Sequence, residues 1–163
     1  MNNISLIKRA IAYMIDLYLG TLLSTIPISL TTYYQFHQIS QDITLFSKPI
    51  SSIVLLLSIF ALILYFLVIP YFFHGQTIGK KIMKYKICYS SFSSLCIRQC
   101  IYMVCLTSLT SLIIQFISLF SSISLTPYIN TFVFILSFVM IIYILCHRNH
   151  IALYDQLAKT EIQ

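Results

Sequence analysis

Charged side chains are scarce in this sequence. They make up 9% of its 163 residues, whereas a soluble domain carries about a quarter. Apolar residues make up 59%, and the mean hydropathy is +0.91. So few charges cannot cover the surface of a water-soluble fold. The sequence therefore predicts an integral membrane protein, with little of the chain left over for a soluble catalytic module.

Acidic residues are scarcer still, with four Asp and Glu against ten Lys and Arg. No pair of carboxylates and no grouping of Ser, His and Asp is placed for hydrolysis, so we expect no enzyme activity. A surplus of positive charge is also typical of nucleic-acid-binding proteins. Here, however, the basic residues stand at the ends of apolar runs and not along one solvated face. We therefore expect no nucleic-acid partner.

Paired metal-binding motifs are missing as well. Cys96 and Cys100 lie four positions apart, and Cys146 is followed by His147 and His150, but neither set has the CxxC or HExxH pattern. All cysteines fall in or beside segments that we place in the membrane or cytoplasm, so a secreted disulfide framework is not expected. We expect reduced thiols, no metal site and no cofactor.

Four apolar runs are long enough to cross a bilayer as helices. The first is too long for the apolar core of a signal peptide, contains Asp16 and lacks a small-residue cleavage site, so we interpret it as an uncleaved span. The sequence predicts an all-α, polytopic fold in a single domain over residues 1–163. The predicted spans cover about residues 10–30, 50–73, 99–120 and 128–146.

The distribution of Lys and Arg predicts the orientation of these spans. The N-terminus has two such residues, the first loop one, the second loop (74–98) five, the third loop none and the tail (147–163) two. Positive residues concentrate on the cytoplasmic side of membrane proteins. We therefore expect four transmembrane helices with both chain ends in the cytoplasm, and a first loop (31–49) that is structured or forms a short interfacial helix.

Ionisable residues within or beside the spans are the candidate functional groups, because placing a charge in the membrane costs about 2.5–3.5 kcal/mol. Arg9 and Asp16 lie two helical turns apart, about 10 Å along the axis, which is too far for a direct pair. Arg9 is expected either to pair with Asp155 in the tail or to be only an orientation signal whose side chain extends to the membrane interface. Asp16 is expected either to bind a cation or proton or to accept hydrogen bonds from Tyr, Ser or Thr hydroxyls.

The motif GQTIGKK follows the second predicted span. It lacks the spacing of a phosphate-binding loop, and no strand precedes it. Gly75 and Gly79 are expected to permit left-handed backbone or a close approach of another segment. The basic residues of this loop are expected to face anionic lipid phosphates, each contributing about 1 kcal/mol; they are Lys80, Lys81, Lys84 and Lys86.

Three segments together resemble the RDD family of bacterial membrane proteins: KRAIAYMIDLYL, GQTIGKKIMKYKI and ALYDQLAKTEI. The residues that correspond to the arginine and two aspartates of the family name are Arg9, Asp16 and Asp155. The sequence departs from the family pattern at three positions. Tyr154 replaces a common histidine, and Lys84 and Lys159 replace glycines. The resemblance implies a location in the bacterial cytoplasmic membrane and, for some members, cation/proton antiport.

Two functions are compatible with these residues. In the first, Asp16 binds a monovalent cation or a proton for exchange, and four spans would then require a homo-oligomer. In the second, Arg9, Asp16 and Asp155 lock the tail against the first span in a structural or accessory module that binds lipids and a partner membrane protein. A water-filled cavity at Asp16 would favour transport, and close packing with every charge paired would favour the module.

Overall fold

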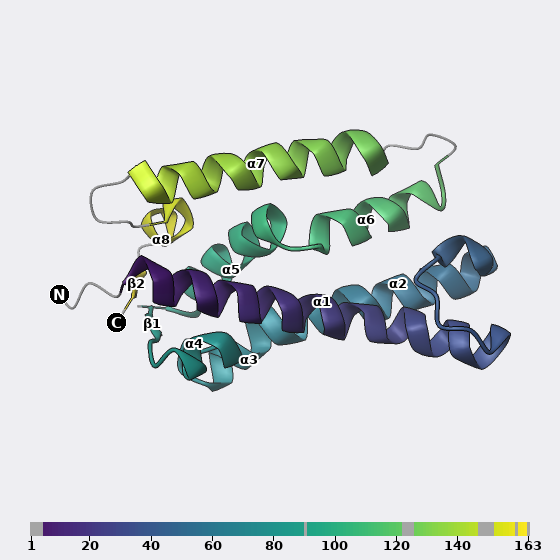
Figure 1. Ribbon diagram of the computed structural model, residues 1–163, viewed down its shortest axis with the longest axis horizontal. Helices are drawn as coiled ribbons and strands as arrows, with labels where there is room; N and C mark the ends of the chain where they lie inside the picture. Colours follow the sequence, from purple (N-terminus) through teal and green to yellow (C-terminus); the bar gives the residue numbers. More distant parts are fainter. Residues whose placement is uncertain (1–4, 90, 122–125, 147–151, 159, 163) are drawn as a thin grey trace.

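The computed structural model describes residues 5–89, 91–121, 126–146, 152–158 and 160–162. Its long helices are α1 (Leu6–Phe36), α2 (Lys48–Ile63) and α7 (Thr126–Cys146), which run along the longest axis of the molecule (Figure 1). The π-helix η2 (Leu64–Val68) and α3 (Ile69–Phe72) continue α2. The all-α fold predicted from the sequence is confirmed.

Within the described residues, three helices are long and apolar enough to cross a bilayer: Leu6–Phe36, Lys48–Phe72 and Pro127–Cys146. A fourth span results if α5 (Phe92–Leu106) and α6 (Leu109–Ser118), which are bent by 68° relative to each other, are counted together. The third predicted span therefore differs from expectation, because it begins at Phe92 instead of residue 99 and is broken in the middle.

Hydroxyl groups surround the break between α5 and α6. Backbone carbonyls near a helix break need other donors inside a membrane, and Ser and Thr side chains commonly supply them. The last turn of α5 receives three such bonds, from Thr107 to the Met103 carbonyl, from Thr110 to Val104 and from Ser137 of α7 to Cys105. The hydroxyl-rich sequence TSLTS thus accounts for how the break is tolerated.

Small and polar residues form the contact between α1 and α2. The buried positions of α1 recur at every fourth residue and include Gly20, where an added Cβ would overlap the ring of Phe66. Side chains of this size let two helices approach closely in a membrane. The buried stripe of α1 consists of Ala12, Asp16, Gly20, Ser24, Ile28 and Thr32.

The end of the second span has an irregular geometry. Pro70 has no amide hydrogen to donate, and the five residues of η2 just before Ile69 form a π-helix. Two consecutive aromatic residues of η2, Tyr65 and Phe66, are both buried and pack edge to face with ring centroids 4.9 Å apart. This geometry directs the Tyr65 hydroxyl toward α1.

Four short elements lie at the end of the molecule where α1 begins (Figure 1). They are α4 (Ile78–Ile82), α8 (Leu153–Leu157) and the antiparallel strands β1 (Ile87–Cys88) and β2 (Glu161–Ile162). The strands tie the second loop to the tail. At the opposite end, the first loop contains the 3₁₀ helix η1 (Ile43–Leu45). This loop is shorter than the predicted 31–49, because α1 continues to Phe36 and α2 begins at Lys48.

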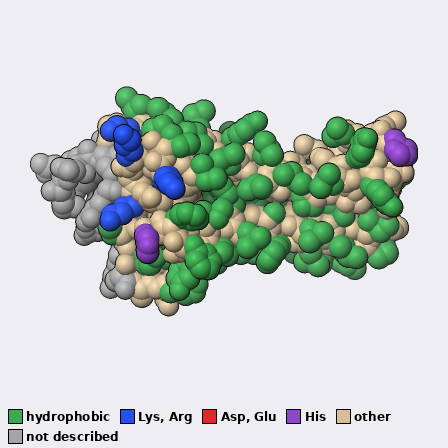
Figure 2. Space-filling view, turned by 90° about the horizontal axis from the view of Figure 1, so that it is seen from below, with side chains coloured by type: hydrophobic (Ala, Val, Ile, Leu, Met, Phe, Trp, Pro, Cys, Tyr) green, Lys and Arg blue, Asp and Glu red, His purple; other side chains and the backbone are tan. Residues whose placement is uncertain are grey.

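The surface has the character expected of a protein in lipid. Figure 2 shows hydrophobic side chains along the length of the molecule, with the Lys and Arg side chains of this face confined to one end. Helix α7 is the least covered of the candidate spans, and Met140 is the one buried side chain among those described on it. Most of α7 is therefore available to lipid or to another membrane protein.

Candidate functional site: two buried carboxylate centres

Asp16 is 1% exposed and is held by three donors from two segments. The Tyr65 hydroxyl from η2 and the Gly79 amide from α4 each donate to Oδ1 over 2.8 Å, and the Thr77 hydroxyl donates to Oδ2. We call these four residues the Asp16 clamp. Each hydrogen bond to a charged group contributes about 1.5–3 kcal/mol. The clamp therefore fixes the end of the second span and the GQTIGK motif against α1.

The glycines of the motif have distinct structural tasks. A Cβ at Gly79 would overlap the Ala12 carbonyl oxygen and the Asp16 carboxylate, so only glycine lets α4 approach α1 this closely. Gly75 has φ +86°, and a Cβ there would overlap the carbonyl of Ile87. Both expected properties, left-handed backbone and close approach, are confirmed, one at each glycine.

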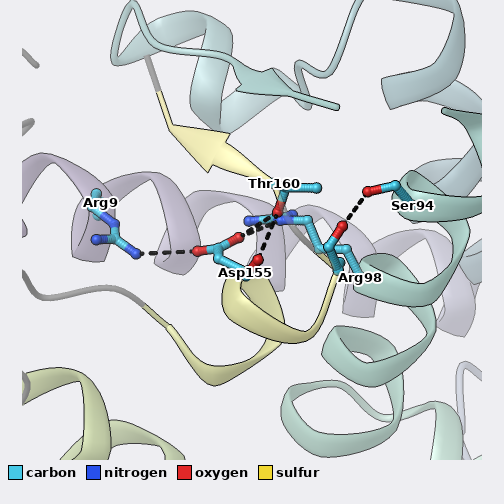
Figure 3. Close-up of polar contacts among 6 residues, drawn as sticks. Arg9, Ser94, Arg98, Asp155 and Thr160 are labelled. Carbon is cyan, nitrogen blue, oxygen red and sulfur yellow. Dashed lines mark hydrogen bonds and ion pairs between the residues drawn. The ribbon is translucent and has the colours of Figure 1, made fainter. Parts of the chain in front are cut away.

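Asp155 forms the second centre. It lies on α8, is 1% exposed, and accepts a 2.6 Å hydrogen bond at Oδ1 from Nε of Arg98 on α5. Thr160 donates to the same oxygen over 3.2 Å, and Nη2 of Arg9 on α1 lies 3.6 Å from Oδ2 (Figure 3). We call these four residues the Asp155 latch. One carboxylate thus joins the tail to two membrane helices.

Backbone contacts support the latch. The amide of Thr160 donates to the Asp155 carbonyl over 3.0 Å, and the Ser94 hydroxyl of α5 donates to the carbonyl of Ala158. The guanidinium of Arg98 also lies 5.0 Å from the centroid of the Tyr154 ring, within cation–π distance. The tail is therefore held to α5 by a hydrogen bond to its backbone, a cation–π contact and an ion pair.

Lys80 lies between the two centres. It directly follows Gly79, is 6% exposed, and its Nζ lies 5.9 Å from the centroid of the Tyr102 ring. The expectation that it faces lipid phosphates is wrong, because α4 packs this side chain into the protein. The other three lysines of the predicted basic surface, Lys81, Lys84 and Lys86, are exposed.

Aromatic rings fill the space between the centres. Tyr65 of the clamp packs on Phe66, Phe66 on Tyr102, and Tyr102 on Tyr154, with centroid distances of 4.9, 5.4 and 5.8 Å. Tyr13 of α1 meets Tyr102 edge to face at 5.9 Å. Such contacts contribute about 0.5–1.5 kcal/mol each beyond their buried area. The two charged centres therefore lie around one packed aromatic cluster.

A protein-family model matches residues 4–159 and is described as the RDD family. The chain belongs to the RDD family. The match confirms the resemblance seen in the three sequence segments. No curated protein and no solved structure matches the chain. The fold and the family together identify an RDD-type multi-pass membrane protein.

The structure separates the three residues of the RDD name into two centres. Arg9 meets Asp155, so the expected contact between them is confirmed. Asp16 accepts hydrogen bonds from Tyr and Thr hydroxyls, which is one of the two arrangements expected for it, and from the Gly79 amide. The GQTIGK motif therefore binds Asp16, the first aspartate of the family name.

Arg98 is the residue that the sequence interpretation missed. It was assigned to the end of the second loop as an orientation signal, but it lies inside α5 and is 3% exposed. The sequence signal for an earlier helix start is Ser91, since serine is a preferred N-cap residue. In the structure its side chain accepts a hydrogen bond from the Ser94 amide at the start of α5. A helix that begins there places Arg98 on the same face as Leu95 and Tyr102, three and four residues away.

The cysteines do not form a described metal site. No group of three or more His, Cys, Asp or Glu side chains lies close enough to hold a metal ion within the part of the chain that the structure describes. Cys96 and Cys100 are free thiols on α5. His147 and His150 lie outside the described residues, so their part of that expectation stays untested.

Proposed function

We propose that this RDD protein is a membrane interaction module whose tail is latched onto the helices by Asp155. The observation that carries the proposal is the pairing of one buried tail carboxylate with Arg98 of α5 and Arg9 of α1. Buried charge pairs can specify one arrangement of a fold, even where they add little to its stability. The latch would therefore fix which surface the protein presents to its partners.

Two surfaces suit such partners. Lys81, Lys84 and Lys86 are exposed in a loop without acidic residues, which fits anionic lipid headgroups. The weakly covered α7 fits a second copy of the chain or another membrane protein. The Lys and Arg distribution supports a cytoplasmic position for both chain ends and this loop. In this proposal the protein lies in a bacterial inner membrane and has no catalytic activity.

The packing around Asp16 also supports the module. Its carboxylate is occupied by three donors, and the apolar pocket lined by Leu67, Val68, Tyr71 and Phe92 does not include it. Close packing of hydrogen-bond donors around this carboxylate is the arrangement expected of a structural module.

The test is Asp155→Asn, which removes the charge and keeps the side-chain shape. It leaves Arg98 buried without its partner, so we expect a lower amount of protein in the membrane and less of the crosslinked oligomer or complex. Asp42→Asn is the matched control, because Asp42 is an exposed acid in the first loop. It caps the helix η1 by accepting a hydrogen bond from the Thr44 amide. Equal effects of the two substitutions, or a wild-type protein that crosslinks to nothing, would count against the module.

Monovalent cation/proton exchange is the second candidate. The observation in its favour is a buried titratable carboxylate, Asp16, in the first span. Proton movement driven by sodium or potassium gradients in vesicles that contain the wild type and Asp16→Asn decides it. Flux in the wild type that Asp16→Asn abolishes supports exchange; absent flux, or flux that the substitution leaves unchanged, refutes it.

A further inference from the structure

The placement of Lys80 ties its charge to the Asp16 clamp. Lys80 directly follows Gly79, whose amide donates to Asp16. Thr77, which also donates to Asp16, is the residue just before α4. The Lys80 side chain is largely removed from water while α4 is packed, since it is 6% exposed and its Nζ lies over the ring of Tyr102. Full hydration of this ammonium group therefore requires α4 to move away from α1.

Groups from three helices face Lys80. Asp16 lies on α1, Arg98 and Tyr102 on α5, and Asp155 on α8. The pKa of Lys80 is lowered to about 7, chiefly by burial and next by the positive charge of Arg98, while the two carboxylates act in the opposite direction. An ordinary lysine has a pKa of about 10.4, so the packed segment disfavours the charged form.

The charges of the two centres balance only when Lys80 is neutral. Arg9 and Arg98 supply two positive charges, and Asp16 and Asp155 supply two negative ones. A protonated Lys80 adds a third positive charge to this buried group. Since a buried charge without its own counter-ion is costly, the protonated form favours any arrangement in which Lys80 reaches water.

We propose that Lys80 is a proton-binding site that controls how firmly the motif segment, residues 75–82, closes over Asp16. Neutral Lys80 permits the closed arrangement, and uptake of a proton favours release of the segment into the aqueous interface. The inference goes beyond the tail latch and does not depend on it, because it concerns the α4 side of the cluster. In this proposal the group that responds to pH is Lys80, and not Asp16.

The direction of the pH effect follows from the two protonation states. The released segment binds a proton on Lys80 up to about pH 10, whereas the closed segment loses it above about pH 7. The ratio of closed to released molecules therefore rises between these values, by up to about tenfold per pH unit for one proton. Below about pH 7 both states carry the proton, and the balance no longer changes.

The experiment uses the small number of glycines in the chain. There are three, so selective ¹⁵N-glycine labelling of the full chain in lipid nanodiscs gives one backbone amide signal each for Gly20, Gly75 and Gly79. Hydrogen-exchange protection of the Gly79 amide, corrected for intrinsic exchange, reports its bond to Asp16. Gly20, in the middle of α1, serves as the internal reference.

We expect wild-type Gly79 protection, relative to Gly20, to be flat below about pH 7 and to rise by up to about tenfold per unit above it. Lys80→Met should give high protection without a slope, and Lys80→Arg low protection without a slope. Lys81→Met, at the neighbouring exposed lysine, is the matched control and should behave like the wild type. A wild type without a slope, a slope kept in Lys80→Met, or a slope lost in Lys81→Met would each overturn the proposal.

Loss of Gly20 protection would reveal a substitution that prevents folding. For that case, a titration of the lysine signals in the wild type tests the proposal without any substitution. The ¹³Cε shift of each lysine follows its protonation. We expect one lysine signal to titrate near pH 7. If no lysine signal titrates near pH 7, Lys80 keeps its proton in the closed segment, and the proposal is wrong.

Discussion

The Asp16 clamp and the Asp155 latch hold two equally buried carboxylates in different ways. Asp16 accepts from two hydroxyls and a backbone amide, all uncharged, and both of its oxygens are bonded. Asp155 relies on two arginines, and no hydrogen-bond donor reaches its Oδ2 within the described part of the chain. The clamp depends on close geometry, whereas the latch depends on charge.

Unused hydrogen-bonding capacity lies on the latch side. On α5, the Nη1 atom of Arg98 and both amide atoms of the adjacent Gln99 are buried without a hydrogen-bond partner among the residues described, as is the Ser108 hydroxyl at the break between α5 and α6. Gln99 is 0% exposed. Unsatisfied buried groups cost about 1–3 kcal/mol each. The latch therefore contains two unsatisfied buried atoms, Nη1 of Arg98 and Oδ2 of Asp155, whereas the clamp has none among the residues described.

The largest expected effect separates the two arginines of the latch. Arg98→Ala leaves Asp155 buried without its close partner and should lower the free energy of unfolding by about 3–5 kcal/mol. Arg9 lies farther from the carboxylate and is partly exposed, so Arg9→Ala should cost about 1 kcal/mol. Unfolding in detergent micelles measures both. Equal losses would mean that the tail is not held mainly through α5.

A smaller effect is expected from Gly79→Ala, which tests geometry on the clamp side. The added methyl group would overlap the Ala12 carbonyl and the Asp16 carboxylate, and such overpacking costs about 1–3 kcal/mol. The charge of the protein is unchanged, so added salt should not alter the loss. Hydrogen exchange of the segment 75–82 should rise. Unchanged protection there would show that the close approach of α4 to α1 is not needed.

The smallest expected effect is a gain in stability. Lys84 has φ +58°, a conformation that costs a residue with a side chain about 1 kcal/mol and that glycine adopts freely. Lys84→Gly should therefore raise the free energy of unfolding by about that amount. Lys86→Gly removes the same charge at an exposed position without positive φ and should not stabilise the protein. Stabilisation by both would point to charge, not backbone strain.

The sequence predicted those features that depend on long apolar runs and on strict steric needs. The all-α fold follows from the runs, and the two glycines follow from a turn and a close approach. The contact between Arg9 and Asp155 was predicted because two unlike charges were placed at one membrane boundary. The hydroxyl partners of Asp16 were expected by type, but their positions were not.

The missed features depend on which side of a helix faces the protein. Lys80 and Lys81 are adjacent and identical, yet one is buried and the other exposed, and that choice arises only when α4 packs on α1 and Tyr102. The apolar run predicts a helix that begins after Arg98, so the sequence places this charge in the second loop. The break after Leu106 was hidden, since hydroxyl-bearing residues are common in membrane helices.

The most direct test of the latch is a double-mutant cycle between Arg98 and Asp155. The single variants Arg98→Met and Asp155→Asn and the double variant are unfolded in detergent under identical conditions. We expect the double variant to lose less stability than the sum of the single losses, with a coupling energy of about 2–3 kcal/mol. Losses that simply add would show that the two side chains do not hold the tail to α5, and would contradict the account.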